Sequence, residues 1–313
     1  MTALLLIPAM ILDAALGEPR SIWSRWPHPA VLMGRLIAAL DQRFNRGDQR
    51  RARGIAVMAA LALAAIALGM AIAALPGGWA LQIVVAAILL AQKSLVQHVQ
   101  AVGDALRLSL GDGQRAVAMI VGRDTAVLDR SGVARSAIES AAENFSDGVI
   151  APAFWFLIGG LPGLLLYKIT NTADSMIGHR TPRHEEFGWA AARFDDLLNL
   201  IPARLSALLL ALSHGWTDPR PILRDAPLHR SPNAGWPEAA MAAVLGLRFG
   251  GPRSYDGKTV NLPYMGEGRD TITRDDIRRG VAVVSKAMVL MLLGMLFGWF
   301  LVAAVDTLSW FSP

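Results

Sequence analysis

The 313-residue sequence contains no cysteine and few charged residues. Without cysteine there can be no disulfide framework, iron–sulfur cluster, thiolate nucleophile or zinc site with thiolate ligands. Charged residues make up 18% of the chain, whereas soluble domains carry about 25%. Hydrophobic residues make up 53%, and the mean hydropathy is +0.39. This composition excludes a disordered chain and a fibre, and it points toward a membrane protein.

Lysine is also scarce, with four occurrences, so the net charge of +5 rests on arginine. A basic balance can indicate nucleic-acid binding. Here, however, the basic residues lie in blocks between apolar runs, which is typical of polytopic membrane proteins. We therefore expect a lipid bilayer, and no nucleic acid, as a partner.

Several apolar runs predict membrane helices. The run 54–75 has 22 residues and no charge, and the run 281–305 has a single lysine near its start. A membrane-spanning helix needs about 20 apolar residues. Residues 79–102 follow a Pro-Gly-Gly turn, so 54–102 reads as a helical hairpin. Residues 148–169 are interrupted by Gly-Gly-Leu-Pro-Gly, which predicts a re-entrant hairpin or a broken helix.

Two further apolar runs are shorter than an ordinary membrane span. Residues 197–212 contain Arg204, which predicts a short buried helix or a span whose arginine faces a polar interior. The N-terminal run contains Pro8 and Asp13 and has no basic residue before Arg20, so we expect an interfacial or buried helix rather than a signal peptide.

The distribution of arginine and lysine predicts the sidedness. Residues 18–53 carry eight basic residues, 93–147 carry six and 213–280 carry ten, while the tail after 305 carries none. The positive-inside rule places the three basic regions in the cytoplasm and the tail outside. The expected fold is all-α: a single-domain, multi-pass membrane protein with a broken or re-entrant helical hairpin and sizeable cytoplasmic loops. Its parts are a basic amphipathic segment (1–53), the hairpin (54–102), an active-site core (136–212), a soluble loop region (213–280) and a terminal span (281–305).

Polar residues concentrate between 136 and 204. An Asn-x-x-Asp unit occurs at Asn144/Asp147 and again at Asn171/Asp174, flanking the broken run, and Asp195-Asp196-x-x-Asn199 resembles it reversed. Positions i and i+3 share a helix face, so each unit presents an amide and a carboxylate together. Such oxygens suit Mg²⁺, although single units also serve as turns and caps.

The hairpin predicts a distance. If both ends of the broken run lie on one side of the membrane, the two units meet at its mouth, with the Asp147 and Asp174 carboxylates within about 10 Å. A straight helix would separate them by about 40 Å.

A third polar constellation lies in the loop region, where His229, Arg230, Ser231 and Asn233 crowd a turn. Glu238 follows Pro237, which suits the first position of a helix. A helix start preceded by such residues is a natural anion site, and a capped surface loop is the alternative. Near the N-terminus, Arg20, His28 and Arg35 sit around proline-rich turns in a similar way.

These motifs together resemble the CobD/CbiB family of cobalamin-biosynthesis proteins, adenosylcobinamide-phosphate synthases. The matching stretches are LDAALGEPR, WPHPAVLMGRLI, ESAAENFSDGVIAP, YKITNTADSMIGH, ARFDDLLNLIPARL, HRSPNAGWPEAAMA and LGLRFGGPRSYDG, in family order from residue 12 to about 257. One departure is Glu18, where the family pattern has aspartate. The resemblance implies an inner-membrane ligase with its active site on the cytoplasmic side. It would join adenosylcobyric acid to aminopropanol or aminopropanol phosphate, using ATP and Mg²⁺, and could contact other corrinoid-pathway enzymes.

The resemblance and the chemistry together suggest roles for the polar residues. The expected metal ligands are Asp147, Asp174, Asp195 and Asp196. The expected catalytic residues are Glu143, Asp147, Asp174, Asp196, His229 and Glu238, with His229 or Glu238 taking the amine proton. The expected substrate- and phosphate-binding residues are Arg20, His28, Arg35, Asn144, Asn171, Ser175, Arg180, Asn199, Arg204, Arg230, Ser231 and Asn233.

Two other classes of protein remain open from the residues alone. Broken helices with buried acids also mark ion sites in transporters and ion-coupled signalling proteins. Lipid-linked phosphotransferases likewise place Asn- and Asp-rich helices around Mg²⁺. The large polar inventory outside the spans favours an enzyme over a permeation path.

Overall fold

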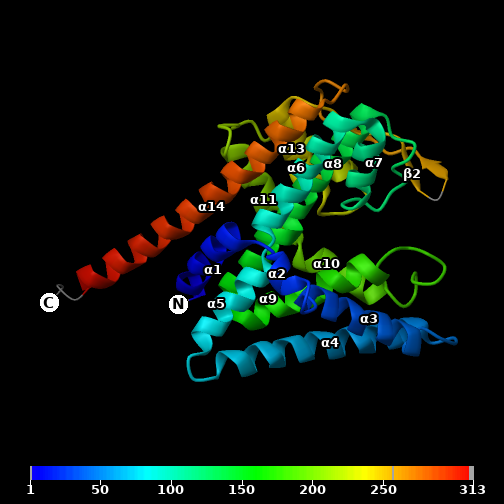
Figure 1. Ribbon diagram of the computed structural model, residues 1–313. Helices are drawn as coiled ribbons and strands as arrows, with labels where there is room; N and C mark the ends of the chain where they lie inside the picture. Colours follow the sequence, from blue (N-terminus) through cyan, green and yellow to red (C-terminus); the bar gives the residue numbers. More distant parts are fainter. Residues whose placement is uncertain (1, 256, 310–313) are drawn as a thin grey trace. The chain divides into compact units, whose positions relative to one another are not determined.

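The structure is a computed structural model that describes residues 2–255 and 257–309. It is almost wholly α-helical, which confirms the expected fold class (Figure 1). The chain divides into two compact units. The first unit comprises residues 1–91 and 151–199, and the second comprises residues 92–150 and 200–313. The stretch 136–212, expected to form the active-site core, contributes to both.

The first unit consists of seven helices in its described part. These are α1 (Thr2–Leu16), α2 (Arg20–Trp23), α3 (Pro29–Phe44), α4 (Arg50–Ala73), α5 (Gly78–Leu89), α9 (Ala151–Ile177) and α10 (Trp189–Leu198). Helix α9 packs against α4 and α10, and α1 packs against α5.

The second unit is also mainly helical. Its helices are α6 (Gln92–Leu108), α7 (Leu110–Ala118), α8 (Arg130–Phe145), the π-helix η1 (Ser146–Ile150), α11 (Leu200–Leu212), α12 (Arg220–Asp225), the 3₁₀-helix η2 (Ala226–Leu228), α13 (Gly235–Leu245) and α14 (Arg274–Ser309). Four short strands form two antiparallel pairs, β1 (Phe249–Gly250) with β4 (Tyr264–Met265) and β2 (Arg253–Tyr255) with β3 (Lys258–Val260). The main apolar core of this unit is built on α6, α8, α11, α13 and α14.

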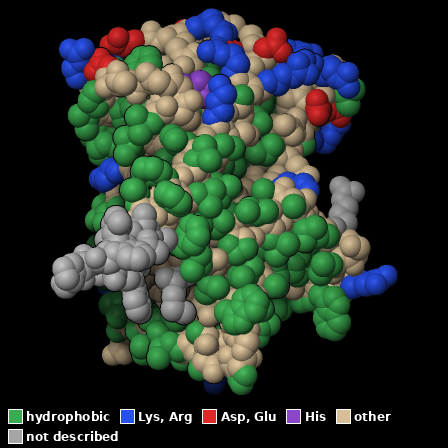
Figure 2. Space-filling model, turned by 90° about the vertical axis from the view of Figure 1, so that its left-hand side faces the viewer, with side chains coloured by type: hydrophobic (Ala, Val, Ile, Leu, Met, Phe, Trp, Pro, Cys, Tyr) green, Lys and Arg blue, Asp and Glu red, His purple; other side chains and the backbone are tan. Residues whose placement is uncertain are grey.

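Four helical stretches of the described chain are long and apolar enough to cross a membrane: Arg50–Ala73, Gly78–Leu108, Arg130–Ile177 and Arg274–Leu301. On α4, Leu63 and Met70 are 69% and 60% exposed, and on α14 both Phe297 and Phe300 are 64% exposed. Figure 2 shows hydrophobic side chains over much of the surface on the side drawn. Surfaces of this kind are unfavourable in water, so the chain is a membrane protein.

The first hairpin forms with one difference from expectation. Helix α4 ends before Pro76, which cannot continue a helix, and Gly77 turns the chain with a φ of +72°. The returning arm was expected to run unbroken from 79 to 102. Instead it divides into α5 and α6, because Leu90 has an extended backbone (ψ 151°). The break falls where the apolar run gives way to Gln92 and Lys93.

The broken helix expected at residues 148–169 is confirmed in α9. Gly160 has non-helical angles (φ 59°, ψ −152°), and Pro162 follows it. The chain reverses there, since Ala151 and Tyr167 lie in one core cluster, and a Cβ at Gly163 would be 2.3 Å from the Trp155 carbonyl oxygen. The second half of α9 continues to Ile177 and is longer than expected.

The turn of this broken helix rests on α4. A Cβ on Gly69 would approach the Pro162 Cα to 2.5 Å, so only glycine allows this contact without a shift. The backbone of the turn is thereby covered by α4, as non-helical backbone at membrane depth requires.

The two short apolar helices agree with expectation, whereas α14 differs from it in its start. Helices α1 and α11 are shorter than a span, at 15 and 13 residues, and Asp13 of α1 is buried. Helix α14 begins seven residues before the expected start at 281. The backbone N–H and hydroxyl of Thr273 donate to Asp276 Oδ2 at 2.8 Å, which caps its first turn.

Candidate functional site

Three acidic residues gather in the first unit where α9 packs against α10. Asp174 lies near the end of α9, and Asp195 and Asp196 lie in the last turn of α10. Their charges interact with one another. The structure thus brings together three of the four carboxylates expected to bind metal. Asp147, the fourth, belongs to the second unit, so its distance from Asp174 stays a prediction.

Asp195 is held by two neutral amides. It is 8% exposed. Its Oδ1 accepts from the Asn171 amide at 3.3 Å, and its Oδ2 accepts from the Asn199 amide at 2.9 Å. The Asn199 oxygen in turn accepts from the Tyr167 hydroxyl at 3.1 Å. Burial and the neighbouring Asp174 charge raise the pKa of Asp195 to about 7, although both amide hydrogen bonds act in the opposite direction.

Asp196 is nearer to cations than Asp195 is. Its Oδ2 accepts from Arg193 Nη1 at 3.2 Å, and Arg180 contributes a further favourable charge. Burial nevertheless raises its pKa. Arg180 is exposed, and so is Ser175, the residue after Asp174.

Gly178 closes the turn below Asp174. Its N–H donates to the Asp174 carbonyl oxygen at 2.7 Å, and a Cβ there would lie 1.9 Å from Asp174 Oδ1. A glycine is therefore needed to let the carboxylate fold over the end of α9.

The donor set of this acid cluster fits Mg²⁺. Across residues 2–255 and 257–309, no three His, Asp or Glu side chains form a ready metal cage. Mg²⁺ usually takes one or two carboxylates and completes its shell with water and substrate phosphates. A buried carboxylate beside two like charges is costly unless a cation compensates it, which is the observation that favours a cation here.

The Asn144/Asp147 motif lies in the second compact unit of the chain, at the junction between α8 and the π-helix η1. Asn144 lies in the last turn of α8, and its amide donates to the Ser140 carbonyl at 2.9 Å and to the Ser140 hydroxyl at 3.0 Å. Asp147 lies in the π-helix η1. Segments of π-helix are rare and frequently occur at functional sites. Glu143 is exposed on α8, and its charge reaches Glu238.

A buried ion-pair network joins α8 to the strands of the second unit. Glu139 is 1% exposed. Its carboxylate accepts from Arg123 at 2.9 Å and from the Gly250 N–H at 2.8 Å, and lies 3.0 Å from Arg253 Nη2. Arg253 also lies 3.7 Å from Glu238 Oε2. The negative charge of Glu139 is therefore balanced by Arg123 and Arg253.

Glu238 and His229 form the other end of this network. Glu238 Oε1 lies 3.7 Å from His229 Nε2, and burial together with the Glu139 charge raises the pKa of Glu238 well above its usual range. Burial and the Arg253 charge lower the pKa of His229. His229 Nδ1 accepts the Ser231 N–H at 3.0 Å. The neutral ring therefore carries its hydrogen on Nε2, facing Glu238.

Hydrogen bonds between residues close in sequence shape the loop before α13. The Ser231 hydroxyl accepts the N–H groups of Asn233 and Ala234 at 3.2 Å. The Asn233 side-chain oxygen accepts from Arg204 Nη1 at 3.2 Å. Helix α13 begins at Gly235, so Pro237 is its third residue, not its first as expected. The first four N–H groups of a helix have no partner within it, so proline is tolerated there too.

The N-terminal candidates have structural contacts. His28 caps α3: its Nδ1 accepts the Ala30 N–H at 3.2 Å, and its Nε2 lies 3.2 Å from the Ile88 carbonyl oxygen. Its ring meets Trp23 edge-on. Arg35 is exposed on α3, and the Arg20 side chain lies outside the described part of the chain.

Sequence analysis missed Glu139, Arg123 and Arg253 as members of a site. Glu139 and Arg253 both lie in quoted motifs, so the signal was present. Their pairing depends on how the strands close over α8, and residue spacing does not encode that.

These features define the class of protein: a polytopic α-helical membrane protein with an acid cluster around the buried Asp195 at α9–α10 and a buried ion-pair network at α8–α13. Within this class, the chain belongs to the CobD/CbiB family, whose model matches residues 6–284.

The relatives are similar over nearly their whole length. The chain is 48% identical to the cobalamin biosynthesis protein CobD of Sinorhizobium fredii, covering 91% of this chain and 93% of the relative. It is 48% identical to that of Rhizobium meliloti, covering 90% and 91%, and 50% identical to that of Brucella suis, covering 82% and 84%. No solved structure matches the chain.

Proposed function

We propose that this protein is the ligase that joins the free propionate carboxylate of adenosylcobyric acid to aminopropanol or its phosphate, consuming ATP with Mg²⁺. Membership in the CobD/CbiB family connects the chain with cobalamin biosynthesis. The observation that carries the proposal is Asp195, a buried carboxylate beside Asp174 whose hydrogen bonds, within the described part of the chain, come from two neutral amides. A bound cation would compensate that charge, and ATP-dependent ligation requires such a cation.

The chemistry begins by activating the carboxylate. A carboxylate oxygen attacks the γ-phosphorus of ATP, the bond to the β–γ bridging oxygen breaks, and ADP leaves with an acyl phosphate formed. The amine nitrogen then attacks the carbonyl carbon, the carbon–oxygen bond to phosphate breaks, and one proton leaves the nitrogen. Mg²⁺, held by one or two carboxylates of the acid cluster and by phosphate oxygens, would reduce the repulsion between the two anions.

Residues of the chain have separate tasks in this proposal. Arg180 beside the acid cluster and Arg230 beside α13 would hold phosphate oxygens. Glu238 is the proposed acceptor for the amine proton. His229 orients that carboxylate from 3.7 Å, and its neutral ring adds no competing charge.

The same reasoning supports an inner-membrane location with the polar loops in the cytoplasm. The four candidate spans make the chain a membrane protein, and the basic loops favour the cytoplasmic side, where ATP is available.

The test uses purified full-length protein in detergent with ATP, Mg²⁺, adenosylcobyric acid and aminopropanol phosphate. Mass spectrometry should detect the amide and one ADP per product. Asp174→Ala and Asp196→Ala should abolish product while the protein still accumulates in membranes. Exposed Asp48 provides the matched control, since Asp48→Ala should keep full activity.

Two results would contradict the proposal. Release of AMP in place of ADP would rule out the acyl phosphate. Protein-dependent corrinoid uptake into vesicles without amide formation would favour the transporter alternative.

A further inference from the structure

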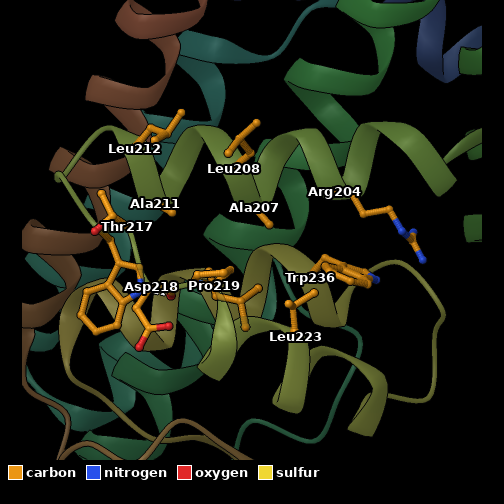
Figure 3. Close-up of a pocket in the computed structure, with 12 residues that line it drawn as sticks. Arg204, Ala207, Leu208, Ala211, Leu212, Thr217, Asp218, Pro219, Leu223 and Trp236 are labelled. Atoms are coloured by element: carbon orange, nitrogen blue, oxygen red, sulfur yellow. Dashed lines mark hydrogen bonds between the residues drawn. The ribbon is translucent and has the colours of Figure 1, made fainter.

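An apolar groove in the second unit has no role in the proposed reaction. It has a volume of about 410 Å³ and is formed by α11, the segment after it, α12 and Trp236 of α13. This volume lies in the range of ligand pockets, about 300–1,000 Å³. In Figure 3, Ala207 and Ala211 lie on the side of α11 that faces Pro219 and Leu223.

The groove is open to an apolar surface. Leu208, Leu212 and Leu223 along it are 53%, 48% and 54% exposed, whereas Ala207 and Ala211 on its floor are buried. Helix α11 packs against the membrane-spanning helix α14 of the same unit. From residue 204 to residue 212, α11 rises about 12 Å, which is the length of wall available to an extended occupant.

One end of the groove carries a single cation. Arg204 Nη1 donates to the Leu200 carbonyl at 2.7 Å and to Asn233, and its guanidinium lies 4.5 Å from the centre of the Trp236 ring. Among residues 2–255 and 257–309, no acidic side chain pairs with Arg204. At the opposite end, near Thr217 and Asp218, the charge of Arg220 is balanced by Asp218, whose Oδ1 lies 2.9 Å from Arg220 Nε.

We infer that this groove binds one anionic phospholipid, with its phosphate on Arg204 and an acyl chain between α11 and α12. The occupant must be apolar along its length and negative at one end, and a membrane protein meets such molecules in the bilayer itself. Tryptophan at the headgroup level is typical of membrane interfaces, and one arginine near anionic headgroups contributes about 1 kcal/mol. This assignment gives Arg204 a lipid phosphate in place of a substrate phosphate.

Native mass spectrometry of the delipidated full-length protein tests this inference. Phosphatidylglycerol and phosphatidylcholine with the same chains are the probes. One phosphatidylglycerol should bind per chain about fivefold more tightly than phosphatidylcholine, the ratio that one arginine provides. Arg204→Gln should remove the preference and keep weak binding of both. Ala211→Trp, which fills the groove, should abolish both, and Ala101→Trp on an exposed face of α6 should change neither.

A second measurement avoids dependence on variant folding. A phosphatidylglycerol with a photoreactive acyl chain should label wild-type peptides within residues 204–223. Equal affinity for the two lipids, or labelling confined to other segments, would overturn the inference. Competition by inorganic phosphate at equal concentration would show that the site binds free phosphate. A dimer that Ala211→Trp dissociates would show that a second copy occupies the groove.

Discussion

Asp195→Asn should stabilise the metal-free protein while abolishing its activity. Burial and Asp174 raise the pKa of Asp195 from its ordinary 3.8 to about 7. Each pH unit of that difference corresponds to about 1.4 kcal/mol, so ionising the buried carboxyl costs the fold on the order of 4 kcal/mol. Asparagine removes the charge but loses about one hydrogen bond, worth about 1 kcal/mol. The net gain should be up to about 3 kcal/mol near neutral pH.

The pH dependence has a definite sign. Between about pH 3.8 and 7 the unfolded chain releases the proton of residue 195 and the folded chain retains it. The folded state then binds more protons, so wild-type stability falls as pH rises through this window and levels off above it. The advantage of Asp195→Asn should therefore widen from pH 5 to pH 7.5 and then stay constant.

Thermal unfolding in detergent with a chelator, followed by tryptophan fluorescence, measures this advantage. Asp48→Asn is the control, because that side chain is exposed and its substitution should leave the midpoint unchanged at every pH. Adding Mg²⁺ should stabilise the wild type more than the variant. A variant that is less stable than the wild type throughout, or a difference that does not change with pH, would refute the reasoning.

Three further outcomes are expected. Gly69→Ala should lower the free energy of unfolding by about 1–3 kcal/mol through overpacking, because a Cβ there would lie 2.5 Å from the backbone of the turn. Gly294→Ala is the control, since a Cβ there would have nothing within 4 Å. The unfolding midpoints of the two variants measure the difference. In intact spheroplasts, an impermeant thiol reagent should label Leu75→Cys but not Pro232→Cys, and the reverse pattern would invert the topology. Asp41→Asn should lower the free energy of unfolding by about 1 kcal/mol at pH 7. Burial opposes ionisation of Asp41, but its arginine and asparagine partners outweigh burial and lower its pKa. The loss of stability, measured by unfolding midpoints, should therefore shrink as the pH falls through 4.

Much of the fold could be predicted because lipid imposes simple constraints on sequence. Long uncharged runs gave the spans, and Gly-Gly-Leu-Pro-Gly gave the break in α9, since glycine and proline interrupt the hydrogen-bond ladder wherever they occur together. The break at Leu90 could not be predicted in the same way. That residue has no special backbone chemistry, so its extended conformation reflects the packing of α5 and α6 into different units.

The acid cluster could be predicted in part for a related reason. The i, i+3 spacing places Asn171 and Asp174 on one face of α9, and the structure brings Asp195 of α10, also expected as a ligand, against Asn171. Spacing could not reveal that Glu139 meets Arg253, 114 positions away in the chain. Nor could it reveal the tautomer of His229, which a backbone N–H of its own loop determines.

The two buried carboxylates Glu139 and Asp195 suggest how structural and functional acids can be separated. Glu139 faces Arg123, Arg253 and a backbone N–H, so its charge is balanced and the contacts stabilise the strands against α8. Among residues 2–255 and 257–309, the hydrogen-bond partners of Asp195 are two neutral amides, and it lies beside two like charges. A buried carboxylate beside two like charges is retained when a ligand from outside the chain, here a cation, balances its charge. Replacing Glu139 should therefore unfold the second unit, whereas replacing Asp195 should leave a folded protein that has lost its cation.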